Sequence, residues 1–138
     1  MPDPTAYVYF ALRGDFDPHA IAASVALETD RCVNKHLHDA ERQLPRTSLL
    51  DYARQETFDE LVDVYTLAER VVDILEPHAQ SLVAALRSCP AASATLQVVV
   101  WFPAASSNVS TPILGFSQRV IAFMATLGAG IDIDSYRR

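Results

Sequence analysis

The chain has 138 residues, half of them hydrophobic, and a formal net charge of -6, which predicts one domain with a continuous core over residues 1–138. An acidic chain without a stripe of Lys and Arg does not suit a phosphate backbone, so we expect no nucleic-acid partner. We expect no membrane-spanning segment, because the apolar runs are shorter than the roughly 18–20 residues that a membrane span needs. We also expect a cytoplasmic protein, because no export signal opens the chain and two cysteines far apart in sequence fit reduced thiols.

The first elements predicted are a strand and a short helix. Residues Tyr7–Leu12 are aromatic and apolar at consecutive positions, which is typical of a central strand covered on both faces. Asp17 precedes Pro18, and a carboxylate before a proline is a common helix start. The sequence therefore predicts a helix from Pro18 to about Leu27.

Two weaker strands are expected next. Residues 30–36 and 47–54 alternate in part between apolar and polar positions, which indicates the two strands of a hairpin. The polar stretch at residues 37–46 between them is expected to be a solvated loop.

A long amphipathic helix follows the hairpin. Residues 57–60, Thr-Phe-Asp-Glu, match a capping box, so the helix is expected to begin there. Its apolar positions then recur at intervals of three and four, at Leu61, Val64, Ala68, Val71, Val72 and Leu75. Because proline lacks an amide hydrogen, Pro77 is expected to divide this helix into two segments.

The last third predicts a strand, a helix and a strand. Residues 95–102 are rich in β-branched and aromatic side chains and predict a second central strand. Ser117 is a suitable N-cap for a helix that ends at Gly128. The alternation in residues 131–134, Ile-Asp-Ile-Asp, predicts a final strand that buries its isoleucines and exposes its aspartates.

The order of these elements predicts an α+β fold. We expect a mostly antiparallel sheet of about five strands with helices packed on one face. The first six elements match a split βαβ (ferredoxin-like) core, which a C-terminal helix and strand would extend.

Four segments of the sequence resemble one protein family, and together they span nearly the whole chain. They are residues 9–18, 75–77, 114–117 and 132–136. On these residues the chain resembles the domain of unknown function 4279 family of mainly bacterial proteins. The family's tryptophans and its lysine-glycine pair around the hairpin are missing from residues 31–51. The family has no established activity, so the resemblance implies a fold and carries over no catalytic residue.

The best candidates for a metal site are Cys32, His36 and His38, because thiolate and imidazole are good zinc ligands. Asp39 and Glu41 lie beside them in sequence, but the spacing matches no zinc signature and nothing fixes a fourth ligand. We therefore expect a solvated loop with no metal or cofactor.

Asp15, Asp17, Asp132 and Asp134 form a second candidate group, which could converge if the first and last strands ended at one edge.

No catalytic motif stands out. Ser117 is not in a nucleophile elbow, and Cys89 has no histidine near it in sequence. The leading hypothesis is therefore a non-catalytic protein-interaction module that uses an exposed sheet face or edge, either as a homodimer or as an immunity-like partner of a basic protein. Catalysis is left open but is not favoured.

The alternative is a small-molecule-binding protein or an enzyme with a pocket between the sheet and the 37–46 loop. Tyr7, Tyr9, Tyr52 and Trp101 are the aromatic residues that would line such a pocket. Strand aromatics usually pack in the core, so we favour core positions for all four.

Overall fold

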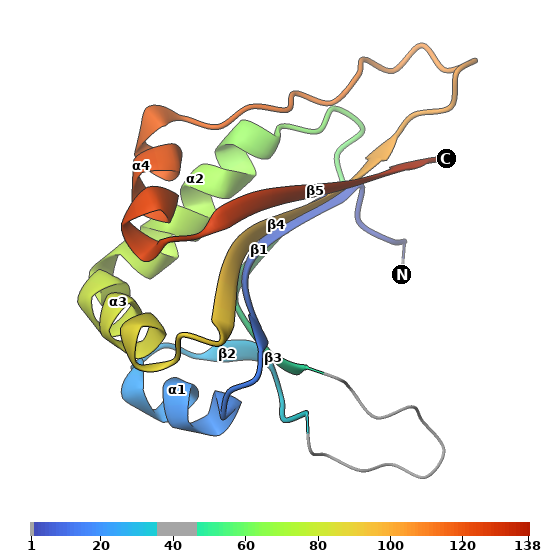
Figure 1. Cartoon of the computed structure of the whole chain (residues 1–138). Helices are drawn as coiled ribbons and strands as arrows, with labels where there is room; N and C mark the ends of the chain where they lie inside the picture. The colour runs from blue at the N-terminus through green and yellow to red at the C-terminus, as the bar shows by residue number, and fades with distance from the viewer. Residues whose placement is uncertain (1, 36–46) are drawn as a thin grey trace, which may run out of the picture.

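The computed structural model describes residues 2–35 and 47–138 and has an α+β fold (Figure 1). The loop expected at residues 37–46 lies outside the described residues. The elements in chain order are β1 (Ala6–Gly14), α1 (Pro18–Ser24), β2 (Thr29–Val33), β3 (Ser48–Thr57), α2 (Val64–Leu75), the 3-10 turn η1 (Glu76–His78), α3 (Ala79–Ser88), β4 (Ala92–Phe102), α4 (Gln118–Leu127) and β5 (Gly130–Arg137).

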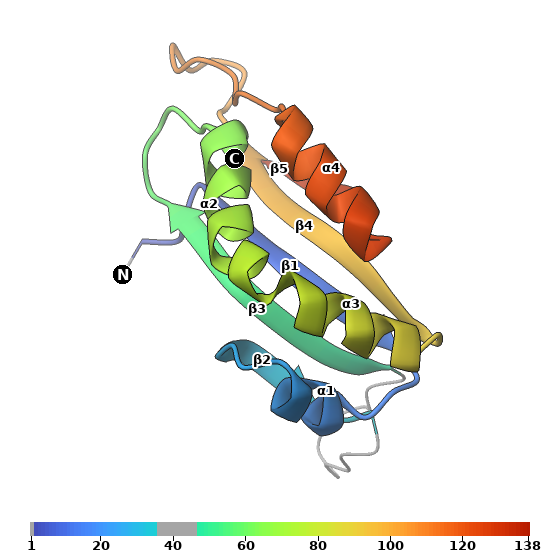
Figure 2. The ribbon, with the colours of Figure 1, turned by 90° about the vertical axis from the view of Figure 1, so that its left-hand side faces the viewer.

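The sheet has five strands in the order β2-β3-β1-β4-β5. The first three pairings are antiparallel, whereas β4 and β5 are parallel, so the sheet is mixed and the expected antiparallel, ferredoxin-like plan is matched only in part. Figure 2 shows the helices together on one face. The sheet is bent, with the helices on its convex side, and its other face is concave and free of helices (Figure 1).

Strand β1 is central, and its helix side is more fully covered than its other face. Ala6, Val8, Phe10 and Leu12 are buried beneath the helices, as strand alternation requires. Tyr7 and Tyr9 lie on the opposite face and are only partly buried. The prediction of a strand covered on both faces or nearly so is met in part, because Ala11, on the same face as the two tyrosines, is 3% exposed. A run in which every residue is apolar or aromatic hides the alternation between faces.

The helix boundaries read from capping residues are confirmed at two sites. The Asp17 side chain accepts hydrogen bonds from the amides of His19 and Ala20 and caps α1. Ser117 caps α4 in the same way, and Gly128 ends that helix in the left-handed conformation with φ 66°. Helix α1 ends at Ser24, three residues earlier than expected.

The expected start of the long helix is wrong. Strand β3 continues through Thr57, and the Thr5 hydroxyl donates to the carbonyl oxygens of Thr57 and Asp59, which holds this segment extended. Helix α2 begins after Asp63, whose carboxylate accepts from the Thr66 amide at 3.2 Å. The predicted division at proline is confirmed, because η1 separates α2 from α3.

Glycine is required where β1 ends. Gly14 has a φ of 143°, and a β-carbon there would overlap the carbonyl oxygen of Ala91. Gly14 is also paired on both sides, with Ser48 of β3 and Ala92 of β4. A side chain at this position would therefore force the neighbouring strand away.

Strand β5 lies at the edge of the sheet, and every one of its residues is exposed. Ile131 and Ile133 are 37% and 40% exposed, so the prediction that they are buried is wrong. Their positions on the helix side lie at the margin of the sheet, where the helices give little cover. Among the described residues, no helix is long and apolar enough to span a membrane.

Candidate functional site

Four aromatic side chains form a row across the concave, helix-free face. Tyr7 lies 6.0 Å from Tyr9 and 6.0 Å from Trp101, measured between ring centroids, and Trp101 lies 5.2 Å from Tyr136. These separations are typical of interacting aromatic pairs. We call Tyr9, Tyr7, Trp101 and Tyr136 the aromatic row. It crosses from β1 to β4 and then to β5, where Trp101 and Tyr136 are register partners.

A bulge in β3 adds an arginine to the aromatic row. The register between β1 and β3 shifts near Ala53, which has a φ of 60°. Without this extra residue, strand alternation would turn Arg54 toward the helices. With it, the Arg54 guanidinium lies 3.8 Å from the centre of the Tyr7 ring, in a cation–π contact, and Glu56 pairs with it at 3.4 Å.

An ion-pair cluster lies beside the aromatic row. The Asp51 carboxylate binds Arg13 at 2.6 Å and Arg31 at 3.0 Å, and the Asp51 side chain is only 9% exposed. We call Arg13, Arg31 and Asp51 the ion-pair cluster. Burial, and then the charge of Asp51, raise the pKa of Tyr9, so its hydroxyl stays protonated. A hollow of about 250 Å³ separates the cluster from the aromatic row.

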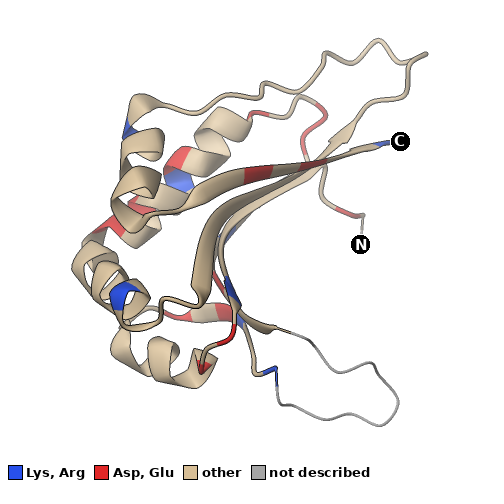
Figure 3. Ribbon diagram, viewed as in Figure 1, with Lys and Arg blue, Asp and Glu red and all other residues tan. Residues whose placement is uncertain are grey.

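The opposite end of this face is acidic. Asp132 and Asp134 lie on β5 with the same orientation as Tyr136, since residues two apart in a strand share a face. The Gln97 amide donates to the Asp134 carboxylate at 3.1 Å. Figure 3 shows acidic residues, in red, along β5. The face therefore runs from arginines on β1–β3 to aspartates on β5.

Trp101 stands between these two ends. It contacts both Tyr7 and Tyr136, and it also lines a hollow of about 220 Å³ beside Thr5 and Arg138. Of the candidates predicted from the sequence, Trp101, Asp132 and Asp134 share this face.

Asp15 lies elsewhere. It forms an ion pair with Lys35 beyond the end of β1. Asp132 pairs in register with Gln97 of β4, and Gln97 pairs with Tyr9 of β1, so Asp132 and Tyr9 lie at the same height in the sheet. Asp15 is six residues beyond Tyr9, which is about 20 Å along an extended chain. The structure therefore does not bring Asp15 together with Asp132 and Asp134.

The histidine candidates are only partly addressed by the structure. His36 and His38 lie outside the described residues. The Cys32 thiol contacts His19 at 3.6 Å between Sγ and Nδ1. Burial, and then Asp17, raise the pKa of Cys32, whereas a nucleophilic cysteine needs a lowered one. Within residues 2–35 and 47–138, no three His, Cys, Asp or Glu side chains could share a metal ion.

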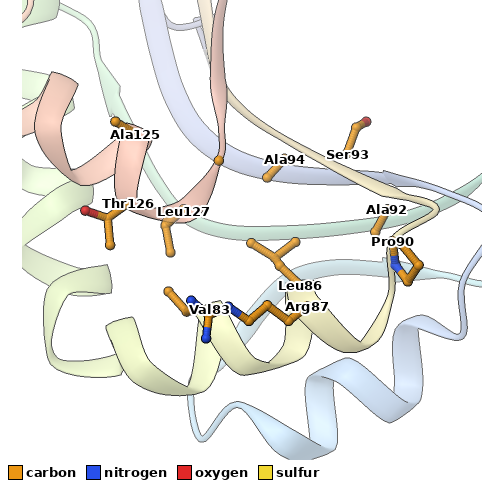
Figure 4. A pocket seen from close by; sticks show the side chains of 11 residues that line it. Val83, Leu86, Arg87, Pro90, Ala92, Ser93, Ala94, Ala125, Thr126 and Leu127 are labelled. Atoms are coloured by element: carbon orange, nitrogen blue, oxygen red, sulfur yellow. The ribbon is translucent and has the colours of Figure 1, made fainter.

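A groove of about 530 Å³ lies on the helix side, between α3, α4 and the start of β4 (Figure 4). Val83, Leu86 and Leu127 give it apolar walls, and Arg87 is the charged residue among the described side chains that line it. Among these lining residues, no nucleophile contacts a base.

The family assignment agrees with the sequence. The profile of the family described as Domain of unknown function (DUF4279) matches residues 4–138. The chain belongs to this family. The resemblance is thus confirmed, although the family description assigns no activity. A search of curated proteins and a search of solved structures each found no match.

Sequence reasoning missed several residues of this face. Tyr136 could have been found by extending the Ile-Asp alternation two residues further, because it has the same parity as Asp132 and Asp134. Arg54 could not, because the bulge that turns it depends on pairing with β1. Tyr52 is fully buried on the helix side, which agrees with the favoured core position. Tyr7, Tyr9 and Trp101 are only partly buried on the opposite face, so the favoured core position is wrong for these three.

Proposed function

We propose that this protein is a non-catalytic interaction module that binds a basic protein through its helix-free sheet face. The observation that carries the proposal is the aromatic row, which places Tyr9, Tyr7, Trp101 and Tyr136 on a face without a covering helix. Tyrosine, tryptophan and arginine are enriched among the few residues that contribute most of the binding energy in protein interfaces. Arg54, whose guanidinium lies over the Tyr7 ring, adds the third of these residue types.

Charge supports a basic partner. The chain has a net charge of -6, and the β5 end of the face carries Asp132 and Asp134. Complementary charge accelerates encounter and orients the two proteins. We expect the partner's basic residues to meet this acidic end and its apolar residues to lie on the aromatic row.

Photo-crosslinking tests the proposal. Benzoylphenylalanine replaces Tyr136 or Tyr7 on the face, and Tyr65 of α2 serves as the control position because it is similarly exposed, at 44% against 50% for Tyr136. We expect both face positions to crosslink one basic protein, identified by mass spectrometry, and the control to miss it. Crosslinking that is absent, or equal from all three positions, would contradict the proposal.

Purified partner then gives the energetic test. Trp101→Ala should weaken binding by about thirtyfold or more, since central interface aromatics contribute about 2 kcal/mol or more. Tyr65→Ala should leave the affinity unchanged. Equal affinities for the two variants would place the interface elsewhere.

A second candidate function is the binding of a small molecule in the hollow beside the ion-pair cluster. Tyr7, Tyr9 and Arg54 line it, so aromatic stacking and a cationic donor are both present. Its volume of about 250 Å³ is below the roughly 300–1,000 Å³ of most ligand pockets, which is why we favour a protein partner. NMR fragment screening, with chemical-shift changes confined to these residues, would support this second candidate.

A further inference from the structure

The outer edge of β5 is an unpaired strand edge. β5 pairs with β4 on one side, and no described strand pairs with its other side. All eight of its residues are exposed, and no proline interrupts it. Its unpaired backbone groups are a template for another strand, and its charged residues Asp132, Asp134 and Arg137 restrict which strand can pair.

The backbone groups that face outward can be identified. The Arg138 amide donates to the Phe102 carbonyl oxygen at 3.1 Å, so the even-numbered residues of this strand are turned toward β4. Because strand residues alternate in the direction of their hydrogen bonds, the odd-numbered amides point away from the sheet. These are the amides of Ile131, Ile133, Ser135 and Arg137.

The two sides of this edge differ in chemistry. Asp132 and Asp134 lie on its concave side, and Ile131 and Ile133 on its helix side. On α4, Ile121 is 53% exposed.

Helix geometry shows which way Ile121 points. Arg119 binds Glu69 and Glu76, so its side of α4 faces α2. Two residues further on, a helix has turned by about 200°, which turns Ile121 away from α2. Ile121 is therefore an exposed apolar side chain on the side of α4 that α2 does not cover.

We infer that the outer edge of β5 accepts an extended segment of the partner protein in which basic and apolar residues alternate. The inference rests on the proposed function and specifies how the partner engages. Basic side chains of the added strand would lie beside Asp132 and Asp134, and apolar ones beside Ile131 and Ile133. The alternation is the same in a parallel and an antiparallel strand, so it does not depend on strand direction.

A second copy of the chain fits this edge poorly. Antiparallel pairing of two β5 strands centred on Ile133 sets Asp132 opposite Asp134 of the second copy. Pairing centred on Asp132 or Asp134 sets that residue opposite its own equivalent. Like charges directly opposite are destabilising. Pairing centred on Ser135 avoids this clash and sets Asp132 opposite Arg138, but it also sets Ile133 opposite Arg137, so the apolar side meets a charge. This register is the one in which a second copy competes, and the test below identifies it by its dependence on protein concentration.

The test supplies the strand in cis. A segment of about eight residues that alternates lysine and valine is fused after Arg138 through a Gly/Ser linker of about ten residues, which spans about 17 Å and keeps the local concentration near millimolar. Amide hydrogen exchange is then measured residue by residue. We expect exchange to slow by about tenfold or more at Ile131, Ile133 and Ser135. The even-numbered amides, already bonded to β4, are the internal control.

Matched segments separate shape from charge. A segment with glutamate in place of lysine should give no protection, and a segment with the same composition in shuffled order should give less. Asp132→Lys combined with Asp134→Lys should reverse the preference, so that the glutamate segment protects the edge. This reversal separates recognition by charge from a general effect of the substitutions on folding.

Several outcomes would overturn the inference. These are no protection with the lysine segment, equal protection by both segments, or protection in the unfused protein that rises with its concentration, which would identify a second copy as the occupant. Failure of the proposed function is distinguishable. If photo-crosslinking maps a partner to the aromatic row while the edge stays unprotected, only the edge inference falls.

Discussion

Replacing Asp51 with asparagine measures what the ion-pair cluster contributes to the free energy of unfolding. The Asp51 side chain is 9% exposed and receives charge-assisted hydrogen bonds from two arginines. A hydrogen bond to a charged group contributes about 1.5–3 kcal/mol, and the 2.6 Å bond from Arg13 belongs in that range because the Arg13 side chain is itself mostly buried. Arg31 is 50% exposed, so solvent reduces its contribution to about 0.5–1 kcal/mol.

These contributions predict that Asp51→Asn lowers the free energy of unfolding by about 2–4 kcal/mol. Urea denaturation followed by circular dichroism gives the change, and Arg13→Met should cost more than Arg31→Met. Glu56→Gln is the matched control, because the Arg54–Glu56 pair is long, at 3.4 Å, and exposed on both sides. The control should cost less than about 0.5 kcal/mol.

A second readout tests the same assignment. The charge of Asp51 helps to raise the pKa of Tyr9, so Asp51→Asn should lower the pKa of Tyr9 part of the way toward its ordinary value. The part of the shift that burial causes should remain. A loss of stability below about 1 kcal/mol, or equal costs for Asp51→Asn and Glu56→Gln, would refute the reasoning that burial sets the strength of the cluster.

Three further predictions concern the core, a tight turn and a helix contact. Tyr52→Phe should raise the free energy of unfolding by about 1 kcal/mol in thermal melts, because the buried Tyr52 hydroxyl has no hydrogen-bond partner in the described part of the chain. Burial raises the pKa of Tyr52 from 10.0 to about 12, so wild-type stability should fall as pH rises between these values, and the variant should lack that loss. Gly14→Ala should cost more than about 3 kcal/mol by urea denaturation, because its β-carbon would overlap main chain. Hydrogen bonds from Ser117 and then Arg119 lower the pKa of Glu69. These bonds therefore stabilise the folded protein at pH values above the ordinary Glu pKa of 4.5, and this stabilisation is lost as the pH falls through the lowered pKa. In an NMR titration, Arg119→Met should move the pKa of Glu69 back toward its ordinary value.

The elements with local signals were predictable from the sequence. Asp17 and Ser117 mark helix starts, because each side chain accepts hydrogen bonds from amides two or three residues further on. Gly128 marks a helix end by its own backbone conformation. The β-branched run of β4 is a signal of the same local kind. The error at residues 57–60 has a non-local cause, since Thr5 bonds to this segment from more than fifty residues away.

The candidate site was less predictable, because it depends on which strands are neighbours. Trp101, Asp132 and Asp134 were identified individually, but nothing in their sequence positions indicates that Trp101 would lie between Tyr7 and Tyr136. The exposure of the isoleucines in β5 follows from its place at the edge of the sheet. A strand's alternation tells which residues share a face, whereas its neighbours decide whether that face is covered.

The central place of β1 has a consequence for how the chain is made. Gly14 pairs with Ser48 and Ala92, and Ala6 pairs with Thr57 and Val100, so β1 has both of its neighbours far along the chain. Contacts at such separations slow folding, because a long loop must close before they form. On the ribosome, the apolar side of β1 stays without its full set of strand neighbours until β4 has emerged. Until then, the apolar side and unpaired edges of β1 are open to aggregation and to chaperones.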